Sequence, residues 1–365
     1  MTRAGRSVFR IALAAALLLP AGLDRLRADE AVQALAKYDK PVDGAINKAL
    51  AYLAGKQHKE GYFASSMGKS TAVTSLAVMA FLAKGYTPGT GPYGEHINRG
   101  IDFVIARQKP NGLLIGTGSR GPMYSHSIST LMLSEVSGMV DSRRQEKLDK
   151  ALPHAVRLIL TAQQVRKAKN FQGGWRYQAT SKDSDISCTG WALMSLRSAR
   201  NNGAQIPLKA INDAVGFVLR CRSRKAAPPR GKRPAGVGFG YQPGGAAGPG
   251  RTATALLCLE LCGKHRSKEA VGAGDWVLAH PQRSYGQGYF YYALYYNAQG
   301  MFQLGGRHWP AFAERMYEMM LKFQRKDGSW PQGSSGEAVA GPCYATAMGV
   351  LAMSVSYRQL PIYQR

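Results

Sequence analysis

The densest set of chemically capable side chains in this sequence lies between residues 182 and 191. Two acids, Asp183 and Asp185, come shortly before the thiol of Cys188 and the indole of Trp191. A carboxylic acid in such a cluster could protonate an alkene, or the acids and the thiol could hold a metal ion. The alternative is a helix start, with Asp185 as the N-cap and Asp183 near the positive end of the helix dipole. Asp183 and Asp185 are the candidate catalytic pair, and capping is the simpler interpretation.

Aromatic residues recur at equivalent places along the chain. Packing of turns against helices would explain them, and so would a cavity rim that contacts isoprenoid chains or sugar rings. The candidate ligand-binding residues are Trp175, Tyr177, Trp191, Tyr124, His126 and Tyr344. Tyr124 or His126 could also act as a base that abstracts a proton next to a uronate carboxylate. Arg176 and Arg251 would then neutralise the acid.

These residues fall within a repeating unit. Each unit has an apolar helix, a turn that pairs glycine with an aromatic or apolar residue, a short loop, and a second helix rich in Ala, Leu, Ser and Thr. In the third unit, apolar residues at helical spacing over 148–163 lead through the turn at 172–175 to a helix that begins near Asp185. The other turns are at 61–63, 112–113, 238–240 and 328–330, and a degenerate unit spans 276–303. Six helical hairpins are predicted, and they must stack because none can bury both apolar faces alone.

The turns at 172–175 and 327–330, with the helices that follow them, resemble the repeats of squalene cyclases and protein prenyltransferase β subunits. The resemblance covers roughly residues 45–356. It implies an all-α fold, an α/α toroid whose inner helices surround a central cavity with the turns on one rim. The catalytic motifs of those families are incomplete. The Asp-x-Asp-Asp motif of squalene-hopene cyclases lacks its last acid, because Ile186 follows Asp185, and the spacing from Asp185 to Cys188 does not fit the prenyltransferase zinc motif.

The chain begins with the layout of a secretory signal. Arg3, Arg6 and Arg10 precede an apolar run over 11–19, and small residues follow up to Ala28. The run is nine residues long, whereas a helix needs about 20 to cross a bilayer. We therefore expect export to the periplasm or the cell exterior. The predicted parts are a signal peptide (1–28), a lead-in segment (29–44), a repeat domain (45–356) and a C-terminal tail (357–365).

The chain is strongly basic, with 48 Lys and Arg against 22 Asp and Glu and a formal charge of +26. This balance favours anionic partners, and export makes nucleic acid the least expected of them. A cationic insertion over 220–236 is predicted to be an exposed loop that could contact an anionic cell-envelope surface. Its charged residues are Arg220, Arg222, Arg224, Lys225, Arg230, Lys232 and Arg233.

The five cysteines lack paired motif spacing. We therefore expect buried small hydrophobic side chains rather than a metal site or a disulfide framework, and we predict no cofactor.

Together these features predict an exported α/α-toroid protein that binds an apolar or isoprenoid-type ligand in its central cavity. Two alternatives stay open: a lyase or binding protein for acidic glycans, and an interaction scaffold at the cell envelope. If the protein is an enzyme, the expected class is terpenoid cyclase-like or polysaccharide lyase-like. The sequence leaves the oligomeric state undetermined.

Overall fold

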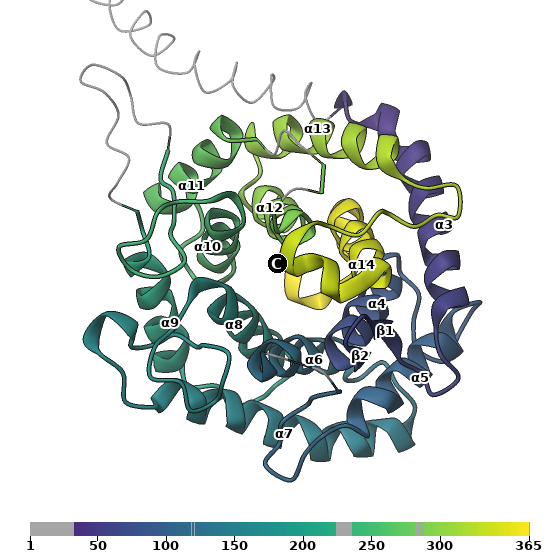
Figure 1. Cartoon of the computed structure of the whole chain (residues 1–365), viewed down its shortest axis with the longest axis horizontal. Coiled ribbons are helices and arrows are strands. Elements are labelled where there is room, and N and C mark those ends of the chain that lie inside the picture. The colour runs from purple at the N-terminus through teal and green to yellow at the C-terminus, as the bar shows by residue number, and fades with distance from the viewer. Residues whose placement is uncertain are drawn as a thin grey trace, which may run out of the picture.

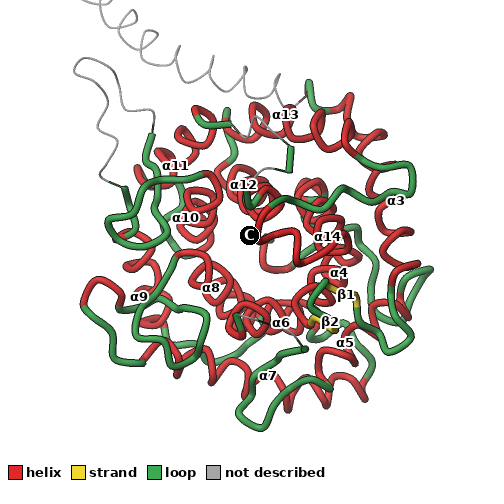
Figure 2. Tube along the Cα trace, viewed as in Figure 1, coloured by secondary structure: helices red, strands yellow, loops and turns green. Residues whose placement is uncertain are grey.

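The computed structural model describes residues 33–117, 119, 121–223, 236–281, 285–286 and 288–364. Within them, twelve α-helices form two concentric rings, and the chain alternates between the outer ring and the inner one (Figure 1). Figure 2 shows that helices make up nearly all of the regular structure, beside one short pair of strands. The fold class predicted from the sequence, an all-α toroid of helical hairpins, is confirmed.

The outer helices are α3 (Asp39–Lys56), α5 (Gly94–Ile105), α7 (Ser142–Gln164), α9 (Leu208–Arg220), α11 (Lys268–Ala279) and α13 (His308–Phe323). The inner helices are α4 (Thr71–Ala83), α6 (Pro122–Val136), α8 (Ile186–Asn201), α10 (Pro249–Leu261), α12 (Phe290–Leu304) and α14 (Gly341–Met353). Short elements are β1 (Phe63–Ser65), β2 (Gly68–Ser70), η1 (Ala36–Tyr38), η2 (Lys169–Phe171), η3 (Ser335–Ala340), η4 (Val355–Tyr357) and η5 (Pro361–Tyr363). Each outer helix leads to the next inner helix, so the inner helices all begin on one face of the ring, which we call the mouth.

The two rings differ in residue pattern because they differ in burial. In α4 every residue except Ala72 is buried, since an inner helix has neighbours on all sides. The outer helix α5 buries one face, with Ile97, Ile101 and Val104 at helical spacing, and leaves the other face to solvent. Threonine is tolerated inside because its hydroxyl bonds within the helix, as Thr130 Oγ1 does by donating to the carbonyl one turn earlier at 2.8 Å.

Each glycine-containing turn connects the two helices of one hairpin and packs against the outer helix of the next hairpin. Gly173 has a φ of +88°, and a Cβ atom there would lie 2.2 Å from the carbonyl oxygen of Asp213 in α9, so only glycine fits. Gln163, near the end of α7, donates from Nε2 to the carbonyls of Gly173 and Ala210, both at 2.8 Å. The Trp175 ring is buried and donates from Nε1 to the backbone of α7 at 2.7 Å. One turn therefore holds two successive outer helices together.

The same glutamine bridge recurs along the chain and closes the ring. Gln57 and Gln108 make the corresponding pairs of hydrogen bonds in the first two hairpins. In the last hairpin, Gln324 Nε2 donates to the carbonyl of Gly328 at 2.9 Å and to that of Ala45, in α3, at 2.7 Å. Because α3 is the first outer helix, this bridge joins the two ends of the repeat, and α14 packs against α4. The hairpins thus form a closed ring and not an open solenoid.

The C-terminal segment fills the end of the ring opposite the mouth. After α14, the chain passes through η4 and η5 and ends at the centre of the ring (Figure 1). Tyr363 is 5% exposed, its hydroxyl bonds to that of Tyr295 in α12, and its carbonyl accepts from Gln303 Nε2 at 3.0 Å. The amide of Ile362 donates to the carboxylate of Glu135 at 3.1 Å. Within the predicted C-terminal tail, Leu360, Ile362 and Tyr363 are therefore part of the packed interior, whereas Arg358, Gln359 and Gln364 are exposed.

Some sequence predictions fall outside or across the described residues. Residues 1–28 lie outside them, so the signal peptide and export stay predictions. Helix α3 runs across the predicted boundary between residues 44 and 45, because its apolar face already contacts the core at Val42. Among the helices that the structure describes, none combines the length and apolarity needed to cross a bilayer.

Replacing Gly173 with alanine should destabilise the ring. The new Cβ would meet the Asp213 carbonyl in a left-handed backbone conformation, at a cost of roughly 3 kcal/mol or more. Thermal unfolding of G173A should therefore occur well below that of the parent protein. The control is Gly55→Ala in α3, where a Cβ meets nothing within 4 Å and alanine favours the helix. Equal unfolding temperatures for G173A and the parent would show that this turn tolerates a side chain.

Glu135, at the end of the ring opposite the mouth, makes the stability of the protein depend on pH. The residue is 1% exposed, and burial raises the pKa of its carboxyl from 4.5 to about 7, although Ser198 and the Ile362 amide donate to it. The unfolded chain loses this proton near pH 4.5, whereas the folded chain keeps it to about pH 7. The contribution to stability is therefore full below pH 4.5 and is lost as the pH rises through about 7. The shift corresponds to roughly 3 kcal/mol.

The variant E135Q should remove this dependence. Glutamine still offers an acceptor to the Ile362 amide, but it has no proton to lose in this range. Between pH 4.5 and about pH 8, the free energy of unfolding of the parent should fall by up to about 3 kcal/mol relative to that of E135Q. Denaturant titrations at a series of pH values measure both profiles. Parallel profiles for the two proteins would contradict a role for Glu135.

Candidate functional site

The mouth gathers charged and aromatic side chains from the starts of the inner helices and the loops before them, and Arg176 contacts four of them. Its Nη1 donates to the Asp185 carboxylate at 3.0 Å and to the Tyr241 hydroxyl at 2.6 Å, and its Nε lies 3.2 Å from the Asp183 carboxylate. Burial opposes the charge, but the hydrogen bond to Asp185 and the nearby negative groups outweigh it, so the pKa of Arg176 is raised. The guanidinium therefore stays charged and is held by two carboxylates.

Tyrosine rings surround this guanidinium. Its central carbon lies 4.6 Å from the ring centroid of Tyr177 and 5.3 Å from that of Tyr241. The Tyr177 ring also stacks on Tyr124, with the centroids 5.9 Å apart, and its hydroxyl bonds to that of Tyr241. Tyr177 remains 37% exposed. We call Tyr124, Arg176, Tyr177 and Tyr241 the tyrosine cluster, which presents ordered aromatic surface to solvent.

The two candidate catalytic acids bind the backbone and the same arginine. Asp185 is fully buried and caps α8 by accepting from the amides of Ser187 and Cys188 at 2.8 and 2.9 Å. Asp183 is partly exposed and accepts from Gln242 Nε2 at 3.1 Å. Asp185 thus has the capping geometry that the sequence offered as the simpler interpretation, and both carboxylates are ion-paired.

The thiol beside these acids is not activated. Burial, together with the charge of Asp185, raises the pKa of the Cys188 thiol well above its usual value. Burial likewise raises the pKa of Cys221 to about 12 and that of Cys343 to about 11. The five cysteines are free thiols. Within the described part of the chain, no group of three or more His, Cys, Asp or Glu side chains could hold a metal ion.

A second buried carboxylate at the mouth was missed by the sequence analysis. Glu337, in η3, is 4% exposed and accepts from the amides of Tyr291 and Tyr292, at the start of α12, at 3.1 and 2.8 Å. The Tyr344 hydroxyl donates to it at 3.1 Å, which places this candidate ligand-binding residue in the same network. Burial raises the pKa of Glu337, although these donors oppose the shift. No local signal marked the residue, because Tyr291 lies 46 residues away in sequence.

The candidate tryptophans lie inside the ring. Trp191 is 1% exposed, stacks on Tyr295 and meets Tyr296 edge-on, each with ring centroids 5.3 Å apart. Its ring therefore has no free face. Trp175 is also 1% exposed and is held by its turn. Both side chains support the ring, whereas Tyr124, Tyr177, Asp183 and Asp185 do come together at the mouth.

His126 takes the place of a threonine that recurs in the repeat. In four hairpins a threonine near the start of the inner helix accepts from a turn amide, as Thr189 does from Trp175 at 3.1 Å. His126 Nδ1 accepts from the Leu114 amide at 3.1 Å, and its Nε2 lies 3.0 Å from the Ala155 carbonyl. Burial lowers its pKa to about 4. The imidazole is thus neutral and both of its nitrogens are bound to backbone, which is the geometry of a packing residue.

The described part of the cationic insertion contacts the chain itself. Arg220 donates to the carbonyls of Asn170, at 3.2 Å, and Gln172, and Arg222 lies 3.9 Å from Glu269. The remaining basic residues lie outside the described residues: Arg224, Lys225, Arg230, Lys232 and Arg233. Binding of an anionic surface through this insertion stays a prediction.

No known protein-family model and no curated protein sequence matches this chain. Solved structures do match it. A glycosidase in complex with glucose aligns over 88% of this chain and 98% of its own, with 11% identity and a TM-score of 0.56. A D-mannose isomerase aligns over 87% and 98%, with 14% identity and a TM-score of 0.53. An alpha-amylase from Clostridium perfringens aligns over 86% and 97%, with 8% identity and a TM-score of 0.53.

The two concentric rings of helices make this chain an α/α-toroid protein. At identities this low, the shared shape establishes the fold alone. The particular repeat family that the turns resemble is not established by these likenesses.

Removing Arg176 should destabilise the protein through Asp185. Because Asp185 is fully buried, methionine at position 176 would leave its charge unpaired, at a cost of roughly 3 kcal/mol. In the double variant R176M/D185N, asparagine can still cap α8 and no charge is left buried, so part of the stability should return. Denaturant unfolding of both single variants and the double variant measures this coupling. Strictly additive losses would mean that the two side chains act independently.

Proposed function

We propose that this protein binds carbohydrate at its mouth, through the tyrosine cluster. The observation that carries the proposal is the partly exposed ring of Tyr177, stacked on Tyr124 and fixed by Arg176. An aromatic ring that is already ordered loses little side-chain entropy when a ligand contacts its exposed part. Isoprenoid chains and sugar rings can both pack on aromatic surface. The polar side chains beside the tyrosine cluster therefore decide which of the two ligand classes fits better.

The polar groups beside the rings favour sugar. Asp183 and Gln242 lie at the edge of the cluster, where a carboxylate oxygen and an amide oxygen can accept from sugar hydroxyls. Both hydrogens of Gln242 Nε2 are already donated, to Asp183 and to the Ser184 carbonyl. Sugar rings combine an apolar face of C–H groups with hydroxyls at the edge, so aromatic surface with convergent polar groups complements them. Tyr289, 63% exposed at the start of α12, adds further aromatic surface to the mouth.

Recognition by stacking is favoured over recognition by charge. Arg176 is the cation of the cluster, and it is already paired with two carboxylates, Asp183 and Asp185. A uronate carboxylate would have to displace one of them, with Asp185 fully buried. We therefore infer that the ligand is a neutral glycan, whose sugar ring contacts the tyrosine cluster, in preference to the acidic glycan considered from the sequence.

Binding without bond cleavage is also favoured. Glycoside hydrolysis needs one carboxyl group as an acid and another as a base or nucleophile at the scissile bond. At the mouth, Asp185 and Glu337 accept from helix amides, and Asp183 is paired with Arg176. These carboxylates are engaged in holding the mouth together.

An apolar ligand on the ring axis receives less support. Trp191, the residue expected to contact it, is enclosed by Tyr295 and Tyr296, and Tyr363 packs from the other end. The resemblance to squalene cyclase repeats concerns the turns, where Gly173 and Trp175 both serve the backbone. It therefore supports a related fold more than a related ligand.

The test compares Y177A with the parent protein on a panel of neutral and acidic polysaccharides. Loss of the exposed ring should weaken binding of the best neutral ligand roughly tenfold, while Y177F should bind as the parent does, because it keeps the ring. Binding measured by calorimetry should survive about 0.5 M salt, since stacking is not screened.

The control is Tyr86→Ala, a partly buried tyrosine beyond the end of α4, on the face opposite the mouth. It should leave binding unchanged. The proposal fails if Y177A and Y86A bind alike, or if only polyanionic ligands bind and salt removes them.

A further inference from the structure

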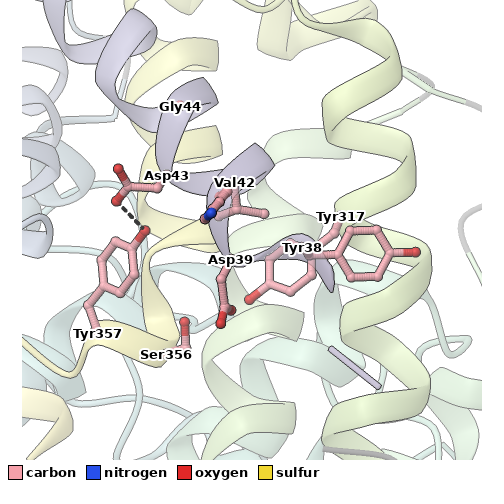
Figure 3. A pocket seen from close by; sticks show the side chains of 9 residues that line it. Tyr38, Asp39, Val42, Asp43, Gly44, Tyr317, Ser356 and Tyr357 are labelled. Carbon is pink, nitrogen blue, oxygen red and sulfur yellow. Dashed lines mark hydrogen bonds between the residues drawn. The ribbon is translucent and has the colours of Figure 1, made fainter. Parts of the chain in front are cut away.

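A groove on the face opposite the mouth is lined by tyrosines and carboxylates (Figure 3). Its volume is about 460 Å³, and it lies where the first turn of α3 meets α13 and η4. Its lining includes three tyrosines and two aspartates: Tyr38, Tyr317, Tyr357, Asp39 and Asp43. Aromatic faces next to carboxylates are surroundings that stabilise ammonium groups.

The chain's own lysines already show this chemistry at the groove. Lys84 Nζ lies 4.6 Å from the ring centroid of Tyr357 and pairs with the carboxylate of Asp43. Lys37 Nζ lies 5.0 Å from the ring centroid of Tyr38. An ammonium group therefore lies over a groove tyrosine at two separate points.

One carboxylate in the groove is left without such a partner. Asp39 is exposed, lies between Tyr38 and Ser356 in Figure 3, and makes no ion pair within the ranges that the structure describes. The rings of Tyr38 and Tyr317 stand beside it with centroids 5.5 Å apart and planes tilted by 46°. Asp39 and these two rings thus offer a counter-ion and an aromatic wall to a further cation.

We propose that this groove binds a compact organic ammonium group, with Asp39 as the counter-ion and Tyr38, Tyr317 and Tyr357 as the aromatic walls. The site is separate from the mouth and does not depend on carbohydrate binding there. Lys40 lines the same groove and carries the same charge as the ligand, so it opposes binding. Free choline and the choline headgroup of a lipid share this chemistry, and the experiment separates the two sources.

The experiment titrates choline chloride into the full chain and follows binding by calorimetry. We expect saturable binding that D39N weakens about three- to tenfold and that K40Q strengthens. The matched control is Asp213→Asn, which removes an exposed carboxylate that pairs with Lys209 in α9, away from the groove, and should change nothing. The neutral tert-butyl isostere of choline, equal in shape but uncharged, should bind at least about threefold more weakly.

Three results would overturn the proposal: no saturable binding of choline, equal binding of the neutral isostere, or the same affinity in folded D39N as in the parent. A second arm uses phosphatidylcholine vesicles. Vesicle binding that D39N weakens would identify a lipid headgroup as the source of the ammonium. Binding of free choline without vesicle binding would identify a soluble amine.

Discussion

The contact between a turn glycine and the backbone of the next outer helix is the constraint on which the whole ring depends. Five such glycines have φ between +87° and +90°, and a Cβ atom on any of them would lie 2.2 to 2.5 Å from a carbonyl oxygen of that helix. They are Gly61, Gly112, Gly173, Gly236 and Gly328. Because the approach is so close, a side chain at these points would push successive hairpins apart, and the ring could not close between α13 and α3.

The same constraint explains where polar chemistry collects. Turns of one kind bring the starts of all the inner helices to one face, and the free amides at those starts attract carboxylates. Asp185 caps α8 and Glu337 caps α12 in this way. The opposite end receives helix ends and the C-terminal segment, whose amide at Ile362 is satisfied by Glu135. The mouth is thus the polar, accessible end, and the far end of the axis is packed.

This arrangement also explains how the turns can resemble those of cyclases without the catalytic acids. In the third turn, Gly173 allows the close approach and Trp175 anchors the turn to α7, while Gln163, in α7 before the turn, bridges to the next outer helix. All three act on the backbone. Sequence likeness at such positions follows from the geometry of the toroid and carries little information about the ligand, whereas Tyr177 and Tyr241, on the loops that follow the turns, are free to serve a particular protein.

The sequence by itself determined the repeat, the helical hairpins and the all-α class, because helical periodicity and turn glycines are local properties of the chain. It also marked Asp185 as an N-cap, which a helix start shows within a few residues. Ring closure through Gln324 and Ala45, the capping of α12 by Glu337 and the packing of Tyr363 on the axis were decided only by the tertiary structure. Each joins residues far apart in sequence, so no local pattern records it. Burial of Trp191 was decided in the same way, because its enclosing tyrosines come from another helix.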